Sequence, residues 1–132
     1  MKNPTPKSYT LEFTLAGLPK MSNQLLRGHW RAKHGHAKTW KRKVWAECWH
    51  RRPSEPLEKA KLTLVRVSSA EPDTDGLISS FKHIVDGLVE CGVLANDKPS
   101  NIGIPDYRWE RGPRGAGCVR VKVEQVTKEQ SK

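Results

Sequence analysis

The sequence predicts an α/β (α+β) domain in which a small mixed four-stranded sheet is combined with two main helices. Short stretches of alternating polar and apolar residues predict strands near both ends of the chain, and two stretches between them repeat apolar residues at helical spacing. The predicted order is strand, helix, strand, helix, strand, strand, which indicates a sheet covered by helices. The 132 residues suffice for one domain with a modest core. We expect this domain over residues 8–126, between a flexible lead at 1–7 and a polar tail at 127–132.

The first half of the chain predicts one strand and one helix. Residues 9–15 alternate polar and apolar side chains, which is the period of a half-buried strand. Residues 38–50 predict a helix because Trp40, Val44 and Cys48 follow one another at intervals of four. The prolines that come next cannot continue that helix.

The middle of the chain contains the strongest helical pattern. Residues 61–67 first predict a second strand. Residues 76–90 then repeat apolar residues every three or four positions, which predicts an amphipathic helix. Asp75 stands where an N-cap residue belongs, and Gly92 stands where a left-handed C-terminal residue belongs.

The last part of the chain predicts the two remaining strands. They cover residues 106–111 and 118–123, and a stretch rich in glycine and proline joins them. A four-stranded sheet leaves exposed edges and one open face, which makes a homodimer reasonable.

The chain is strongly basic. It has 24 Lys and Arg residues against 14 Asp and Glu residues, a net charge of +10. Such an excess favours a phosphate-rich partner, because bound cationic side chains release condensed counterions. The three cysteines form no CxxC pair, and neither a signal peptide nor a membrane-spanning run is evident. We therefore expect a cytoplasmic protein that does not bind a membrane.

Carboxylates gathered within this positive charge indicate a metal site. Asp73 and Asp75 are separated by one residue, and Asp97 follows the predicted helix. Neighbouring carboxylates repel unless a cation lies between them, and Mg²⁺ prefers oxygen ligands together with water and substrate phosphate. The alternative is that Asp75 only caps the helix, Asp73 only favours the helix dipole, and Asp97 is an ordinary turn residue. Spacing alone does not decide whether Asp97 returns to the pair.

Several polar and glycine residues around this helix resemble the RusA family of Holliday junction resolvases, found in bacteria and their prophages. The resemblance extends over most of the chain, and the residues that carry it are 73–77, Lys82, 86–88, 92–94 and 96–97, with 18–23 and 29–30 nearer the start. It implies a RusA-like fold, a homodimer and a crossover junction endodeoxyribonuclease that acts on four-way or other branched DNA in recombination and repair. It also implies a phage or prophage protein that works in a bacterial cell.

The resemblance also implies roles for individual residues. Asp73, Asp75 and Asp97 would hold Mg²⁺, with Mn²⁺ as an alternative, and together with Lys82 they would be the catalytic residues.

Asn96 and Asp86 would support the metal site without being its main ligands. Three departures stand out: the interval of seven residues between Asp75 and Lys82 is longer than in the best-known member, Gly76 replaces a common asparagine, and Asn96 replaces a frequent fourth acid. Judged from the residues alone, Lys82 forms only a surface ion pair with Asp86, four positions on.

A basic segment rich in tryptophan predicts the DNA-binding surface. Cations supply affinity for the phosphate backbone, and exposed aromatic rings stack on unpaired bases. We expect at least two of Trp40, Trp45 and Trp49 to lie in the core instead. The residues expected to contact DNA are Arg27, His29, Trp30, Arg31, Lys33, Lys38, Lys41 and Arg42.

Other interpretations compete with the nuclease. The histidines and Cys48 invite a zinc site, but their spacing matches no known zinc module. A non-catalytic phage DNA-binding regulator could use residues 38–50 as its recognition helix, which would explain the charge but not the acidic residues. A ribosome-associated RNA binder is supported by charge alone.

Overall fold

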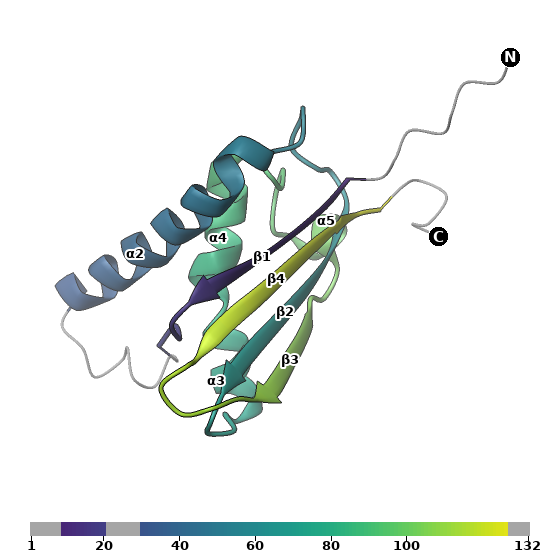
Figure 1. Ribbon diagram of the computed structural model, residues 1–132. Helices are drawn as coiled ribbons and strands as arrows, with labels where there is room; N and C mark the ends of the chain where they lie inside the picture. Colours follow the sequence, from purple (N-terminus) through teal and green to yellow (C-terminus); the bar gives the residue numbers. More distant parts are fainter. Residues whose placement is uncertain (1–8, 21–29, 127–132) are drawn as a thin grey trace, which may run out of the picture.

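The computed structural model describes residues 9–20 and 30–126, although the side chains of residues 30–33 lie outside the described part. It contains one mixed four-stranded sheet with helices along one of its faces (Figure 1). The predicted fold class is therefore confirmed.

The sheet has the strand order β1-β4-β2-β3. Its strands are β1 (Thr10–Ala16), β2 (Ala60–Ser68), β3 (Asp106–Arg111) and β4 (Cys118–Gln125). β4 is antiparallel to both β1 and β2, whereas β3 is parallel to β2. All four predicted strands are confirmed, and their ends differ from the predicted ends by at most two residues.

The core lies between the sheet and its helices. Along β1 the buried residues alternate with exposed ones, so that Leu11 and Leu15 face the helices. Val119 and Val123 of β4 and Leu62 of β2 are fully buried on the same face. This alternation is the physical reason why these segments form a sheet with one apolar side.

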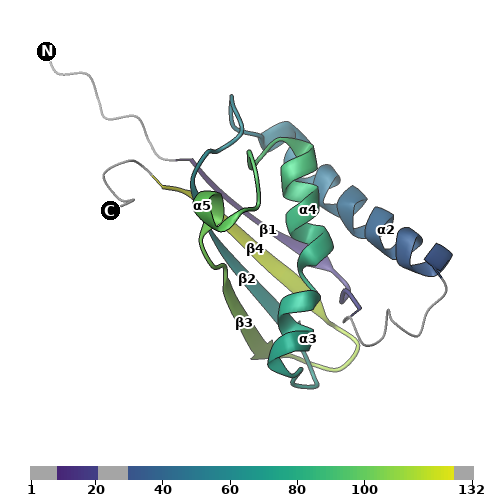
Figure 2. The same cartoon turned by 180° about the vertical axis from the view of Figure 1, so that it is seen from behind.

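Helices cover only this apolar side (Figure 2). α3 (Thr74–Ser79) and α4 (Lys82–Cys91) lie across the sheet, and α2 (Trp30–Cys48) packs against α4 beside β1. A 3₁₀ turn (Trp49–Arg51) extends α2, and the short α5 (Pro99–Ile102) precedes β3. Across the described segments, no helix combines the length and the apolar character that a membrane span requires.

The predicted helix at 38–50 is longer than expected, because α2 already begins at Trp30. Its first turns contain Gly35 and several polar residues. These residues show no amphipathic pattern, so the sequence did not predict that the helix begins there. In the structure, His36 packs edge-on against His83 of α4, and its Nε2 accepts a hydrogen bond of 2.9 Å from the backbone N–H of Lys20. Contacts with distant segments therefore extend the helix where local preference does not.

The helix predicted at 76–90 is interrupted, which corrects that prediction. α3 ends at Ser79 and α4 begins at Lys82. The hydroxyl groups of Ser79 and Ser80 bond to the carbonyl oxygens of Gly76 and Leu77, three residues earlier. Such local bonds from serine compete with the regular helical ladder and allow a bend between the two helices.

Both ends of this helical pair have clear caps. Asp73, not Asp75, is the N-cap of α3, and its side chain accepts a hydrogen bond from the backbone N–H of Gly76. Gly92 ends α4 with φ of 93°, as the sequence predicts, because glycine adopts the left-handed conformation without steric cost. This turn reverses the chain toward α5.

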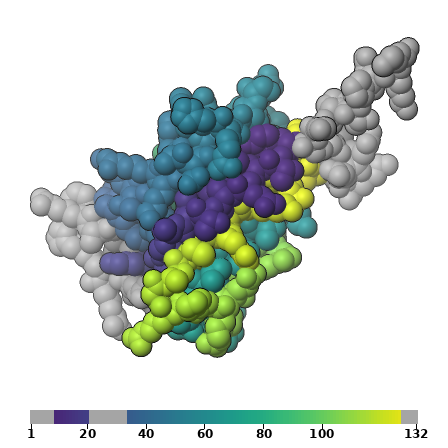
Figure 3. Space-filling model, in the orientation of Figure 1, coloured from purple at the N-terminus to yellow at the C-terminus, as the bar shows by residue number. Residues whose placement is uncertain are grey.

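The other face of the sheet is not covered by any described element. In the space-filling view, β1 and β4 cross this face side by side in the foreground (Figure 3). The open face that the sequence predicts is therefore present in the described part of the chain.

Candidate functional site

The candidate site begins on an exposed flank of α4. Lys82 and Asp86 stand one turn apart, and the Lys82 Nζ atom lies 3.6 Å from an Asp86 carboxylate oxygen. The Lys82 side chain is 70% exposed, so its ammonium group is accessible to a ligand. His83 Nδ1 lies 3.9 Å from the same oxygen. Burial lowers the pKa of His83; Asp86 opposes this shift, whereas the cations Lys41 and Lys82 reinforce it.

The chain returns to this flank after Gly92. Leu57 pairs with Leu94 in an isolated parallel bridge, where Leu57 N–H bonds to Val93 O and Ala95 N–H bonds to Leu57 O, both at 2.9 Å. These bonds fix the start of the loop that contains Asn96 and Asp97.

Within that loop, Asn96 supports the backbone of its neighbour. The Asn96 Oδ1 atom accepts a hydrogen bond of 2.8 Å from the backbone N–H of Asp97. The Asp97 side chain itself is exposed and forms no hydrogen bond or ion pair within the described part of the chain.

A pocket of about 280 Å³ brings these groups together. Lys82, Asp86 and Asp97 line it, while Phe81 and Tyr107 contribute aromatic rings to its wall. Asp97 therefore returns to the flank of α4, and neither Asp73 nor Asp75 lines the same pocket. Asp97 shares the lining of this pocket with Lys82 and Asp86.

The other two predicted ligands do not line this pocket. Asp73 is committed to its cap, where Oδ1 accepts the Gly76 N–H at 2.7 Å, and its Oδ2 atom makes no hydrogen bond within the described residues. Asp75 is exposed in the first turn of α3 and has no described partner. It stands one turn before Ile78 and Ser79, which do line the pocket.

The predicted ligands do not form a complete Mg²⁺-binding site. Within residues 9–20 and 30–126, no three His, Cys, Asp or Glu side chains are placed so that they could hold a metal ion together. The predicted set of Asp73, Asp75 and Asp97 is therefore not assembled in this conformation. The donor chemistry is nevertheless suitable, because Mg²⁺ is commonly held by one or two carboxylates together with water and substrate phosphates.

The zinc interpretation has no support in the described residues, which contain no such ligand group. Cys48 is buried in the core, and burial raises the pKa of its thiol to about 12. His50, two residues later, is exposed in the 3₁₀ turn.

The predicted DNA-binding residues are only partly described. Arg27 and His29 lie outside the described residues, as do the side chains of Trp30, Arg31 and Lys33.

The remaining three predicted contacts lie on α2. Lys38 and Arg42 are exposed and have no ion-pair partner among the described residues. Lys41, by contrast, forms an ion pair with Glu90 of α4 at 3.0 Å. The unpaired cations of this helix are therefore Lys38 and Arg42 rather than Lys41.

The tryptophans of α2 and its 3₁₀ turn differ from the prediction. Trp40 is buried in the core, but Trp45 and Trp49 are exposed, so the expectation that at least two of the three are core residues is wrong. Trp45 and Trp49 stack on each other, and the Arg52 guanidinium lies over Trp49. Sequence reasoning missed this cluster, although Trp45, Trp49 and Arg52 are spaced by four and three residues, which places them on one helical flank.

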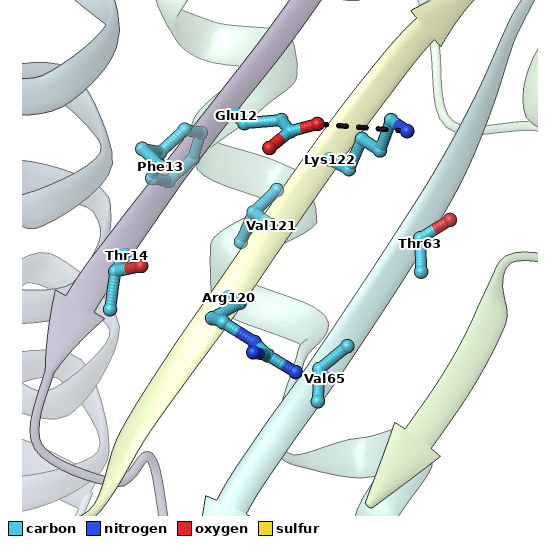
Figure 4. A pocket seen from close by; sticks show the side chains of 8 residues that line it. All are labelled: Glu12, Phe13, Thr14, Thr63, Val65, Arg120, Val121 and Lys122. Atoms are coloured by element: carbon cyan, nitrogen blue, oxygen red, sulfur yellow. Dashed lines mark ion pairs between the residues drawn. The ribbon is translucent and has the colours of Figure 1, made fainter.

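A larger hollow, of about 430 Å³, lies on the uncovered face of the sheet (Figure 4). Its charged groups are paired across strands: Lys122 lies 3.6 Å from Glu12 (Figure 4). Arg120 pairs with Glu110 of β3. Because these charges already compensate one another, this hollow is a weaker candidate for phosphate chemistry than the pocket beside α4.

Comparison with known proteins adds no assignment: no family model matches the chain, and no curated protein is significantly similar to it.

Proposed function

We propose that the protein is a Mg²⁺-dependent endonuclease that cuts branched DNA, chiefly four-way junctions. The observation that carries the proposal is the pocket that Lys82, Asp86 and Asp97 line together. A cation and carboxylates on one exposed surface, in a chain of net charge +10, suit a phosphate diester substrate.

The chain's own residues would have distinct roles in this reaction. Asp97 and Asp75 are exposed carboxylates without described partners, and they would hold the ion together with the free oxygen of Asp73. When bound, the ion would supply an activated water and neutralise charge on the phosphate. Bringing the three carboxylates together requires a change from the conformation described above, which bound DNA or a second copy of the chain would have to induce.

Lys82 would act on the phosphate as a point charge. Its ammonium group is largely exposed and is only loosely paired with Asp86, at 3.6 Å. A cation positioned where negative charge develops stabilises the transition state more than the ground state. Asp86 would orient Lys82 from one turn further along α4.

The DNA would be held by the neighbouring helix. The ion pair between Lys41 and Glu90 joins α2 to α4, so the exposed cations of α2 lie on a helix adjacent to the pocket. A homodimer, which the resemblance to RusA implies, would present two such sites to opposing strands of a junction. The uncovered face of the sheet leaves room for a second copy.

Incubation with a synthetic four-way junction, with and without Mg²⁺, tests the proposal. The wild-type protein should cut the junction only with the metal, and Asp75→Asn and Asp97→Asn should abolish cutting while junction binding is retained. Glu55→Gln is the matched control, because Glu55 is an exposed acid in a loop outside the pocket. Loss of cutting by the control as well would show that the carboxylates act through net charge alone.

A second candidate function is a non-catalytic DNA-binding regulator. It is favoured by α2 itself, a helix of 19 residues with unpaired cations on its exposed flank. Binding of junction DNA without cutting, under every metal condition tried, would favour this regulator over the nuclease.

A further inference from the structure

Trp45, Trp49 and Arg52 form an ordered stack on the surface, here called the Trp45 stack. The ring centroids of Trp45 and Trp49 are 4.7 Å apart, and their planes differ by only 13°. The Arg52 Cζ atom lies 3.5 Å from the centroid of Trp49, and its Nε donates a hydrogen bond of 3.0 Å to the Trp49 carbonyl oxygen. Trp49 is therefore held between an indole ring and a guanidinium group.

The stack remains accessible to solvent. Trp45 is 38% exposed and Trp49 is 41% exposed, whereas Trp40 on the inner side of the same helix is only 5% exposed. Trp49 covers one face of Trp45, and no other described residue makes a ring or cation–π contact with Trp45. The exposed part of the Trp45 ring is thus an aromatic surface that the stack offers to a ligand.

Cations extend the stack along the helix. Lys38, Arg42, Trp45, Trp49 and Arg52 follow one another at intervals of three or four residues, so they form one stripe on the surface. Lys38 and Arg42 have no ion-pair partner in the described part of the chain.

Acidic groups nearby do not compensate this stripe. In α2 and the turn that follows it, Glu47 is the only acid, and it pairs with Arg51 at 3.3 Å. Glu90 of α4 pairs with Lys41. The aromatic face therefore lies beside uncompensated positive charge, which favours an anionic ligand with a flat ring.

We propose that the exposed part of the Trp45 ring stacks on an unpaired nucleobase, while Lys38 and Arg42 bind the phosphates next to it. A nucleotide combines a π face with an adjacent negative charge, and base stacking on aromatic side chains tolerates any base. The ring is already ordered by Trp49 and Arg52, so little conformational freedom is lost on binding. The inference rests on the proposed function only because it takes branched DNA as the partner. The part of the DNA that Trp45 would bind is the branch point, where bases are unpaired.

Binding measurements without Mg²⁺ test the inference separately from cutting. The probes are two labelled DNA duplexes of equal length, one fully paired and one with a bulge of three thymines. The full-length wild-type protein should prefer the bulged duplex. Trp45→Ala should weaken binding of the bulged duplex about tenfold and leave that of the paired duplex within twofold. Trp45→Phe should restore most of the loss, because phenylalanine also offers a ring.

Two controls make the outcome decisive. Ile104→Ala removes an apolar side chain that is 83% exposed outside α2, and it should leave both affinities unchanged. Lys38→Gln should weaken both duplexes, whereas Lys59→Gln, at an exposed lysine outside the stripe, should weaken them less.

Equal binding of the two duplexes by the wild type, or equal losses on both with Trp45→Ala, would overturn the inference. Absence of DNA binding altogether would also overturn it and would favour a protein partner for the stack. A clear preference for the bulge, together with no cutting of junctions, would leave the inference standing and would refute the nuclease.

Discussion

The Asp73 carboxylate accepts a hydrogen bond of 2.7 Å from the backbone N–H of Gly76, so this acid caps α3. A capping role and a metal-binding role require different properties of the same side chain. Asparagine preserves the cap because its carbonyl oxygen accepts the same bond, but it lacks the negative charge that a metal ligand supplies.

The two roles of Asp73 are therefore separable by substitution. Asp73→Ala should lower the free energy of unfolding by about 1 kcal/mol, whereas Asp73→Asn should change it by only a few tenths. If Asp73 also binds the metal, Asp73→Asn should lose junction cutting while its urea unfolding curve stays close to that of the wild type. Full cutting by the stable Asp73→Asn variant would limit this residue to the cap.

Lys82→Ala should lower turnover by about 10²-fold while it weakens junction binding less than threefold, because Lys82 acts at one phosphate among many contacts. Its exposed ion pair with Asp86 contributes only about 0.3–0.5 kcal/mol, so stability should hardly change. Single-turnover cutting and binding titrations measure the two effects separately. Lys59→Ala is the control for loss of one surface charge, and parallel losses of turnover and affinity for Lys82→Ala would assign Lys82 to the binding surface.

Salt dependence should distinguish the two neighbouring cations of α2. Arg42 has no described partner, while Lys41 is paired with Glu90 at 3.0 Å. If Arg42 contacts a phosphate, Arg42→Gln should reduce the slope of log affinity against log salt concentration by about 1. Lys41→Gln should reduce the slope less, since Glu90 already neutralises that charge. Titrations at four salt concentrations would contradict this if both variants kept the wild-type slope.

The strands could be predicted from the sequence because alternation is a local signal. β3 coincides with its predicted range of 106–111, and the alternating residues of β1 and β4 are buried as their period requires. Gly92 was predictable for the same reason, since a glycine after an amphipathic run marks a left-handed cap.

The features that were missed depend on contacts between distant segments. The start of α2 is supported by His36, which contacts Lys20 and His83, and neither contact can be inferred from residues 30–37 alone. The exposure of Trp45 and Trp49 follows from the position of α4, which covers a neighbouring flank of α2. Helical spacing showed that α2 carries several tryptophans. It did not show which side of α2 would be buried against α4.

The arrangement of the candidate site also depends on contacts between distant segments. The resemblance to the RusA family implies roles for Lys82 and Asp97, and both residues line one pocket. The positions of Asp73 and Asp75 relative to that pocket depend on the bend at Ser80, which periodicity did not reveal. Local sequence therefore gave no account of how the carboxylates are arranged around the pocket, because that arrangement depends on the bend between α3 and α4.

Acid should destabilise the protein through His36 and His83. Burial lowers the pKa of both side chains. His83 and Lys20 lower the pKa of His36 further. For His83, Asp86 opposes the shift, whereas Lys41 and Lys82 reinforce it. The unfolded chain then binds protons more readily than the folded chain. The stability that the neutral rings contribute is complete above pH of about 6.5 and is lost as the pH falls below this value.

Urea unfolding at pH 7.5 and 5.5 measures this effect. Protonation of His36 Nε2 would also replace the acceptor of the Lys20 N–H with a second donor, so the contact between them would be lost. His36→Gln should therefore show a smaller decrease in unfolding free energy between the two pH values than the wild type. His50→Gln, at an exposed histidine, should retain the full decrease, and the same decrease in both variants would contradict the assignment.

Gly87→Ala should destabilise the packing of α2 against α4. A Cβ atom at residue 87 would lie 3.1 Å from Val44 Cβ and 3.3 Å from the backbone Cα of Lys41, so groups at the helix interface would have to shift by a few tenths of an ångström. Overpacking of this kind costs about 1–3 kcal/mol, which exceeds the gain of up to about 1 kcal/mol that alanine brings to a helix. Gly35→Ala is the matched control, because no atom lies within 4 Å of its added Cβ and the helical preference of alanine should stabilise α2. Thermal unfolding should therefore give shifts of opposite sign for the two variants, and a stabilised Gly87→Ala protein would show that the helix interface is less tightly packed than these distances indicate.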